Sequence, residues 1–103
     1  MDRIEKIKAL LKETPDDSFL YHALALEHIK QGDDAEAKEL FEKLLAKEPG
    51  YVGSYYHLAK LFERNGDSDA AIKVYAKGME EAKKAGDNHA YGELRGAYEE
   101  LIY

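Results

Sequence analysis

Cysteine and tryptophan are absent from this chain of 103 residues, and proline occurs only twice. Without cysteine, neither a disulfide framework nor a thiolate-ligated metal site can form. No apolar run approaches the ~18 residues that a membrane span requires, so we expect no membrane association. The N-terminal stretch MDRIEKIKALLKETP alternates charged and apolar side chains, unlike the apolar core of a signal peptide. We therefore expect a cytoplasmic protein.

Basic residues are in deficit, with 15 Lys and Arg against 21 Asp and Glu and a formal net charge of −6. The cations are scattered among the acids, whereas a nucleic-acid-binding protein usually gathers them on one face. We therefore expect no nucleic acid among the partners. The length predicts a single domain over residues 1–103, with a core of modest size.

Two stretches of the chain are near-copies of each other. YHALALEHIKQGD begins at Tyr21, and YYHLAKLFERNGD begins at Tyr55, 34 residues later. The same spacing relates Pro15 to Pro49, Ala37 to Ala71 and Phe41 to Tyr75. A fixed period of this length indicates supersecondary units that stack on one another.

Each copy carries apolar residues at the spacing of one helix face, and strand signals are absent. We predict six helices, at residues 3–13, 17–31, 34–47, 51–65, 68–85 and 87–102. Short loops between them favour antiparallel packing of neighbouring helices. Gly32 and Gly66 suit the left-handed residue that ends a helix.

Three serines and one aspartate are candidates for the residues that start these helices. Asp33, with Glu36 three residues on, has the spacing of a capping box. Ser18, Ser54 and Ser68 lie at helix starts, where serine serves as a cap or a surface residue.

The chain resembles the tetratricopeptide repeat family. That family places an aromatic residue, Leu-Gly, an aromatic residue, Ala, an aromatic residue and Pro at set positions. The matching residues are Tyr21, Leu24, Ala25, His28, Ala37, Phe41 and Pro49 in residues 18–51, and Tyr55, Leu58, Ala59, Phe62, Ala71 and Tyr75 in residues 52–85. The chain departs from the pattern where His28 replaces an aromatic residue and where Ala25 and Ala59 replace glycine.

The resemblance implies an all-α fold, a short right-handed solenoid of antiparallel helix-turn-helix repeats. Residues 18–51 and 52–85 are the two full repeats. Residues 1–15 correspond to the second helix of a truncated repeat. We find no repeat pattern in residues 87–103 and expect a capping helix there, with apolar residues toward the last repeat and a polar outer side.

Side chains that could carry catalysis or bind a metal are poorly placed for either. His22 and His28 are six residues apart, whereas helical zinc pairs are three or four apart. His28 takes an aromatic core position, so we expect a packed imidazole. The chain has no G-x-S-x-G motif and no phosphate-binding loop. We expect no enzyme activity, catalytic residue, metal site or cofactor.

The helix at residues 17–31 is apolar on more than one face, which a surface helix does not need. In the repeat family, first helices line a concave groove that holds peptides. The resemblance places Phe19, His22, Leu26, Ile29, Tyr56, Lys60 and Glu63 in that groove. We therefore predict a non-catalytic interaction module or scaffold that binds a protein or peptide. In the alternative, a terminal helix covers the apolar stripe formed by Phe19, Leu26 and Ile29 and makes it part of the core.

Some family members hold acidic C-terminal tails in a basic clamp. Lys60 is the one reliable cation among the facing positions here, so we expect weak binding or none to such tails. A different function also stays open, that of a self-assembling structural element. The sequence YEELIY at the C-terminus places apolar residues at one end, through which two chains could form a symmetric homodimer.

Overall fold

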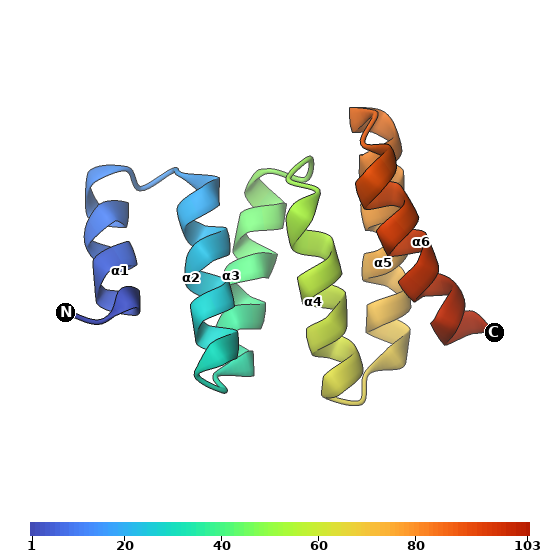
Figure 1. Cartoon of the computed structure of the whole chain (residues 1–103), viewed down its shortest axis with the longest axis horizontal. Helices are drawn as coiled ribbons and strands as arrows, with labels where there is room; N and C mark the ends of the chain where they lie inside the picture. Colours follow the sequence, from blue (N-terminus) through green and yellow to red (C-terminus); the bar gives the residue numbers. More distant parts are fainter. The chain divides into compact units, whose positions relative to one another are not determined.

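The computed structural model describes all residues from Met1 to Tyr103 and contains six α-helices and no strand (Figure 1). The helices are α1 (Arg3–Glu13), α2 (Ser18–Lys30), α3 (Asp34–Lys47), α4 (Gly53–Arg64), α5 (Ser68–Ala85) and α6 (Asn88–Ile102). The predicted all-α class and the six helices are confirmed, and each predicted boundary lies within two residues of the observed one. Every helix is too short or too polar to cross a membrane.

Aspartates begin four of the helices. The side chains of Asp2, Asp17, Asp67 and Asp87 each accept a hydrogen bond from the backbone N–H three residues on, at 2.9–3.3 Å. These carboxylates satisfy N–H groups that have no partner within the helix and favour its positive end. Serine caps none of these helices, so of its two predicted roles only that of a surface residue is left, and the exposed Ser68 fits it. Ser18 and Ser68 follow the true caps, and Ser54 is fully buried inside α4.

The predicted capping box at Asp33 is wrong. Asp33 does precede α3, but its side chain accepts no capping hydrogen bond. Its carboxylate instead lies 3.4 Å from Nδ1 of His28 on the preceding helix. The predicted left-handed turns are confirmed, since Gly32 and Gly66 have φ angles of 81° and 83°. A residue with a Cβ atom would be strained at such angles.

The chain divides into two compact units, residues Met1–Glu48 and Pro49–Tyr103. In the first unit, α2 packs against both α1 and α3. Its buried apolar residues are Ile7, Leu24, Ala25, Ala37, Phe41 and Leu44. An ion pair of 2.8 Å between Arg3 and the buried Glu27 also joins α1 to α2. His28 is buried, as its place in the aromatic pattern predicts.

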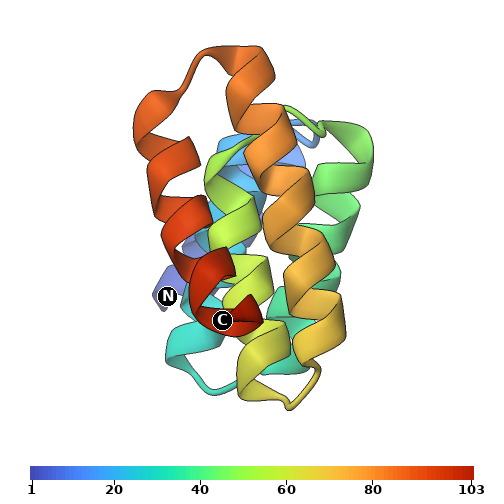
Figure 2. The ribbon, with the colours of Figure 1, turned by 90° about the vertical axis from the view of Figure 1, so that its right-hand side faces the viewer.

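In the second unit, α5 packs against α4 and α6, and α4 also contacts α6. Figure 2 shows α5 and α6 side by side, joined by the turn at Gly86. The buried apolar residues are Tyr55, Leu58, Ala59, Leu61, Ala71, Tyr75, Ala82, Leu94 and Ala97. Burying a large apolar side chain stabilises a fold by about 1.5–3 kcal/mol, so these residues dominate the stability of the unit.

The repeated sequence produces repeated contacts in the two units. The Tyr21 hydroxyl donates a hydrogen bond of 2.9 Å to the carbonyl oxygen of Pro15. The Tyr55 hydroxyl does the same to Pro49, at 2.5 Å. Each tyrosine thus ties the first helix of its repeat to the loop before it.

The first-helix pattern occurs a third time, in α6. Tyr91, Leu94 and Tyr98 follow Tyr55, Leu58 and Phe62 by 36 residues. A fixed period of 34 residues does not detect this copy in residues 87–103, because its spacing is two residues longer. α5 has 18 residues where α3 has 14, and the connection that follows α5 is shorter than the one that follows α3.

Candidate partner-binding surface

The predicted binding residues of the first unit lie along α2. Phe19 follows the Asp17 cap in the first turn of the helix, and 64% of its surface is exposed. His22, Leu26 and Ile29 are half-buried. The His22 ring packs edge-on against Phe41 of α3, with centroids 5.7 Å apart. The stripe is therefore partly packed along its length and open at Phe19.

The predicted binding residues of the second unit gather around Tyr75. The Lys60 ammonium lies 5.5 Å from the Tyr56 ring centroid and 3.4 Å from the Glu63 carboxylate. The Tyr75 hydroxyl donates a short hydrogen bond to the same carboxylate. The Tyr56 and Tyr75 rings meet edge-on at 6.3 Å. We call these four residues, Tyr56, Lys60, Glu63 and Tyr75, the α4 cluster.

The charges within the α4 cluster are balanced. Glu63 neutralises Lys60, and both side chains are only partly exposed. Burial, followed by the hydrogen bond to Glu63, raises the pKa of Tyr75 far above its ordinary value. Tyr75 therefore stays protonated at neutral pH, and its hydroxyl donates a hydrogen bond to Glu63. The cluster presents an aromatic ring and a compensated ion pair rather than a free cation.

The histidines do not assemble into a metal site. The structure contains no group of three or more His, Cys, Asp or Glu side chains that could hold a metal ion. Burial lowers the pKa of His57, although Glu93 opposes the shift. His57 is therefore mostly neutral at physiological pH, and its ring meets Tyr56 edge-on at 5.8 Å.

A cavity of about 180 Å³ in the first unit lies outside the predicted site. Its lining residues are Pro15, Asp16, Ser18, Tyr21, Lys43, Leu44 and Lys47. The Lys47 ammonium closes one part of it by donating to the backbone oxygen and the carboxylate of Asp16, at 2.9 and 3.0 Å. The spacing of these residues in the sequence does not predict a cavity, because the cavity depends on how α2 and α3 pack.

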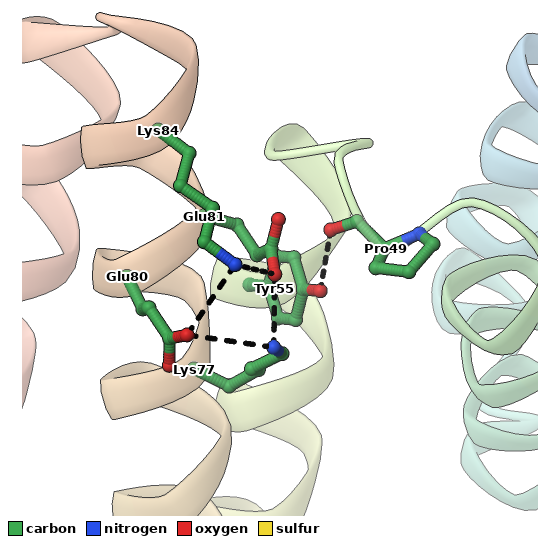
Figure 3. Close-up of polar contacts among 6 residues, drawn as sticks. All are labelled: Pro49, Tyr55, Lys77, Glu80, Glu81 and Lys84. Atoms are coloured by element: carbon green, nitrogen blue, oxygen red, sulfur yellow. Dashed lines mark hydrogen bonds and ion pairs between the residues drawn. The ribbon is translucent and has the colours of Figure 1, made fainter.

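The equivalent positions of the second unit form an ion-pair network instead (Figure 3). Glu81, which stands 34 residues after Lys47, lies 2.9 Å from Lys77 and 3.6 Å from Lys84. The hydrogen bond from Lys77 lowers the pKa of Glu81. Burial, together with the nearby Glu81, raises the pKa of Tyr55. The network lies on α5 beside the core residue Tyr55, so we assign it a structural role in the second unit.

Comparison with known proteins places the chain among helical repeat proteins. The tetratricopeptide repeat family model matches residues 28–98, which is more than half of the chain. The crystal structure of a tetratricopeptide repeat domain protein from Salinibacter ruber is 43% identical, with a TM-score of 0.80. The match covers 84% of this chain and 96% of that one.

Two more distant proteins share the fold or the repeat. The solution structure of a Bordetella parapertussis protein is 22% identical, covers 99% of this chain and 89% of that one, and has a TM-score of 0.84. The mouse interferon-induced protein with tetratricopeptide repeats 3 is 25% identical over 76 residues, or 74% of this chain. The present chain spans only 19% of the length of that relative. The family model and the Salinibacter domain together show that the chain belongs to the tetratricopeptide repeat family.

Proposed function

We propose that this chain is a non-catalytic docking module for a protein or peptide, with contact residues on the first helices α2 and α4. Tetratricopeptide repeat domains generally act as protein-interaction modules, and this family membership is the basis of the proposal. The proposal requires no metal, cofactor or nucleic acid. The predicted residues Phe19, His22, Leu26 and Ile29 on α2, and Tyr56, Lys60 and Glu63 on α4, are its candidate contacts.

The exposure of Phe19 is the observation that carries the proposal. A phenylalanine that is 64% exposed gains little from the fold, and the same helix carries the half-buried apolar residues Leu26 and Ile29 further along. Burying such a ring in a partner contributes about 1.5–3 kcal/mol. Aromatic residues, phenylalanine among them, are enriched at protein interfaces.

The α4 cluster supports a second contact point. Tyr56 combines apolar area with a hydroxyl group, and its ring is held by Lys60 on one side and Tyr75 on another. Side chains that are already fixed lose little conformational freedom on binding. Tyr56 can therefore anchor a partner at low entropic cost, while Lys60 and Glu63 discriminate by charge.

A peptide-display selection tests the proposal even before a physiological partner is identified. Selected peptides would be measured by isothermal titration calorimetry against the wild-type protein, Phe19→Ala and Tyr56→Ala. We expect each variant to lose about tenfold in affinity, which corresponds to about 1.4 kcal/mol. Glu42→Ala and Lys73→Ala alter exposed residues of the second helices α3 and α5 and should bind like the wild type. If the selected peptides bind Phe19→Ala and Tyr56→Ala as tightly as the wild type, the proposal is contradicted.

The physiological partner can be sought by affinity capture. The bait would be the wild-type protein beside the double variant Leu26→Glu, Tyr56→Ala, after circular dichroism has shown that both are folded. A protein retained by the wild type and lost by the double variant would use the proposed surfaces. Equal retention by both baits would place the contact on another face.

A further inference from the structure

Each full repeat fully buries an alanine of its first helix and, at a matching place in both repeats, an alanine of its second helix. Ala25 and Ala59 lie on the first helices α2 and α4, and neither has any exposed surface. Ala37 and Ala71 lie on the second helices α3 and α5 and are equally buried. Two helices can approach closely only where small side chains meet. Small buried side chains at these positions allow α2 to approach α3 closely, and α4 to approach α5.

Arginine takes the equivalent position on both terminal helices. Arg95 of α6 follows Ala59 by the 36-residue spacing, and Arg3 of α1 precedes Ala37 by the 34-residue spacing. Their side chains are 58% and 70% exposed. Each is engaged within its own unit, Arg95 with Glu99 at 3.0 Å and Arg3 with Glu27 at 2.8 Å.

The outer faces of α6 and α1 are otherwise suited to each other. α6 has the pattern of a first helix, and α1 aligns with the second helices. Apolar side chains stay exposed on both, at Ile102 on α6 and at Leu10 on α1. A shallow hollow of about 310 Å³ borders Leu10. The sequence of α1 has four basic and two acidic residues, and that of α6 has three acidic residues and one basic residue. Opposite charge and complementary patterns favour pairing of α6 in one copy with α1 in a second copy.

We propose that Arg3 and Arg95 prevent this head-to-tail pairing between copies of the chain. In such a pair, Arg95 of one copy would face Arg3 of the next. In the full repeats, two buried alanines take these equivalent positions. Two long cations cannot fit there, and both would lose their carboxylate partners and much of their hydration. Like charges placed face to face also repel each other. The two arginines therefore keep the copies apart, in addition to the docking function proposed above.

Sedimentation velocity over a range of protein concentrations tests this inference. We expect the wild-type protein to stay monomeric. The double variant Arg3→Ala, Arg95→Ala should associate at least about tenfold more tightly, into head-to-tail oligomers. Lys8→Ala, Lys73→Ala removes the same charge from exposed positions on α1 and α5 and should stay monomeric. Association by this control to the same extent would overturn the inference.

Two further variants locate the contact and guard against misfolding. Arg95→Ala alone breaks only an exposed ion pair, so it retains the fold and should associate more tightly than the wild type. Adding Leu10→Glu to the double variant should restore the monomer, because it places a charge on the α1 face. The inference is wrong if Arg95→Ala and the double variant both stay folded and monomeric. It is also wrong if association survives Leu10→Glu, or if the wild type associates as strongly as the double variant.

Discussion

Gly78 of α5 lies so close to Tyr55 of α4 that a Cβ atom added to it would be 2.7 Å from the Tyr55 Cβ. The same atom would lie 3.0 Å from Cδ1 of Leu94 on α6. Three helices of the second unit therefore meet at one position without a side chain. In the first repeat the equivalent residue is Leu44, so this close approach is particular to the second unit.

Replacing Gly78 by alanine should destabilise the protein. The new methyl group meets the stem of Tyr55, which cannot move away without shifting α4. Overpacking of this kind costs about 1–3 kcal/mol, which outweighs the gain of up to about 1 kcal/mol in helix propensity. Urea unfolding would measure the loss. Gly96→Ala is the matched control, since Gly96 lies inside α6 with open space at its Cβ position, and it should raise stability.

Tyr75→Phe should destabilise the protein by about 1–2 kcal/mol at pH 8, because the Glu63 carboxylate loses a hydrogen bond. The difference in unfolding free energy between the wild type and the variant should become smaller at alkaline pH. The pKa of Tyr75 is raised in the folded state. Above about pH 10 the unfolded chain releases this proton while the fold retains it, so wild-type stability falls as pH rises. The variant lacks this loss. Urea unfolding at pH 8, 10 and 11 checks it, and the exposed Tyr103→Phe should behave like the wild type.

Glu81→Gln should destabilise the protein at neutral pH, and the difference from the wild type should shrink in acid. The hydrogen bond from Lys77 lowers the pKa of Glu81 in the fold. The stabilisation is therefore present at neutral pH and is lost as pH falls below about 4 and through the lowered pKa. Thermal unfolding between pH 7 and pH 3 would show this. Glu80→Gln alters a more exposed neighbour with longer ion pairs, 3.9 and 3.5 Å, and should have a smaller effect at every pH.

Acidic C-terminal peptides should bind the wild-type protein weakly or not at all, since Glu63 compensates Lys60. Glu63→Gln removes that compensation and should increase affinity several-fold at low salt, with the gain vanishing at high salt. Fluorescence anisotropy with a labelled acidic peptide measures both. The double variant Lys60→Ala, Glu63→Gln should bind the acidic peptide no better than the wild type does. Micromolar binding by the wild-type protein would contradict this account of the α4 cluster.

The fold was predictable because its signals are local and occur more than once. Tyr21 and Tyr55 begin near-identical stretches of sequence, and Gly32 and Gly66 follow the ends of the helices that contain these tyrosines. The capping residues were less predictable, because an aspartate next to a serine offers two candidates for one role. In each case the aspartate proved to be the cap.

The candidate surface stays a prediction, and the sequence did not indicate which side chains its residues contact within the fold. Helical spacing places Tyr56, Lys60 and Glu63 on one face of α4. That Glu63 also binds Tyr75 depends on the packing of α5, which spacing along α4 does not encode. The sequence did not predict the roles of Gly78 and Glu81 for the same reason, since each role depends on a neighbouring helix.

The tyrosine-to-proline hydrogen bonds have a practical consequence for engineering the chain. They tie down the loops that begin at Pro15 and Pro49, so new ends or inserted segments there would break a bond that holds the following helix. The turn at Gly32 is exposed and carries no tyrosine-to-carbonyl hydrogen bond of this kind, and its side-chain contact is the one between Asp33 and His28, at 3.4 Å. A split reporter is therefore better opened at Gly32 than at either proline loop, because a break there spares both tyrosine hydrogen bonds.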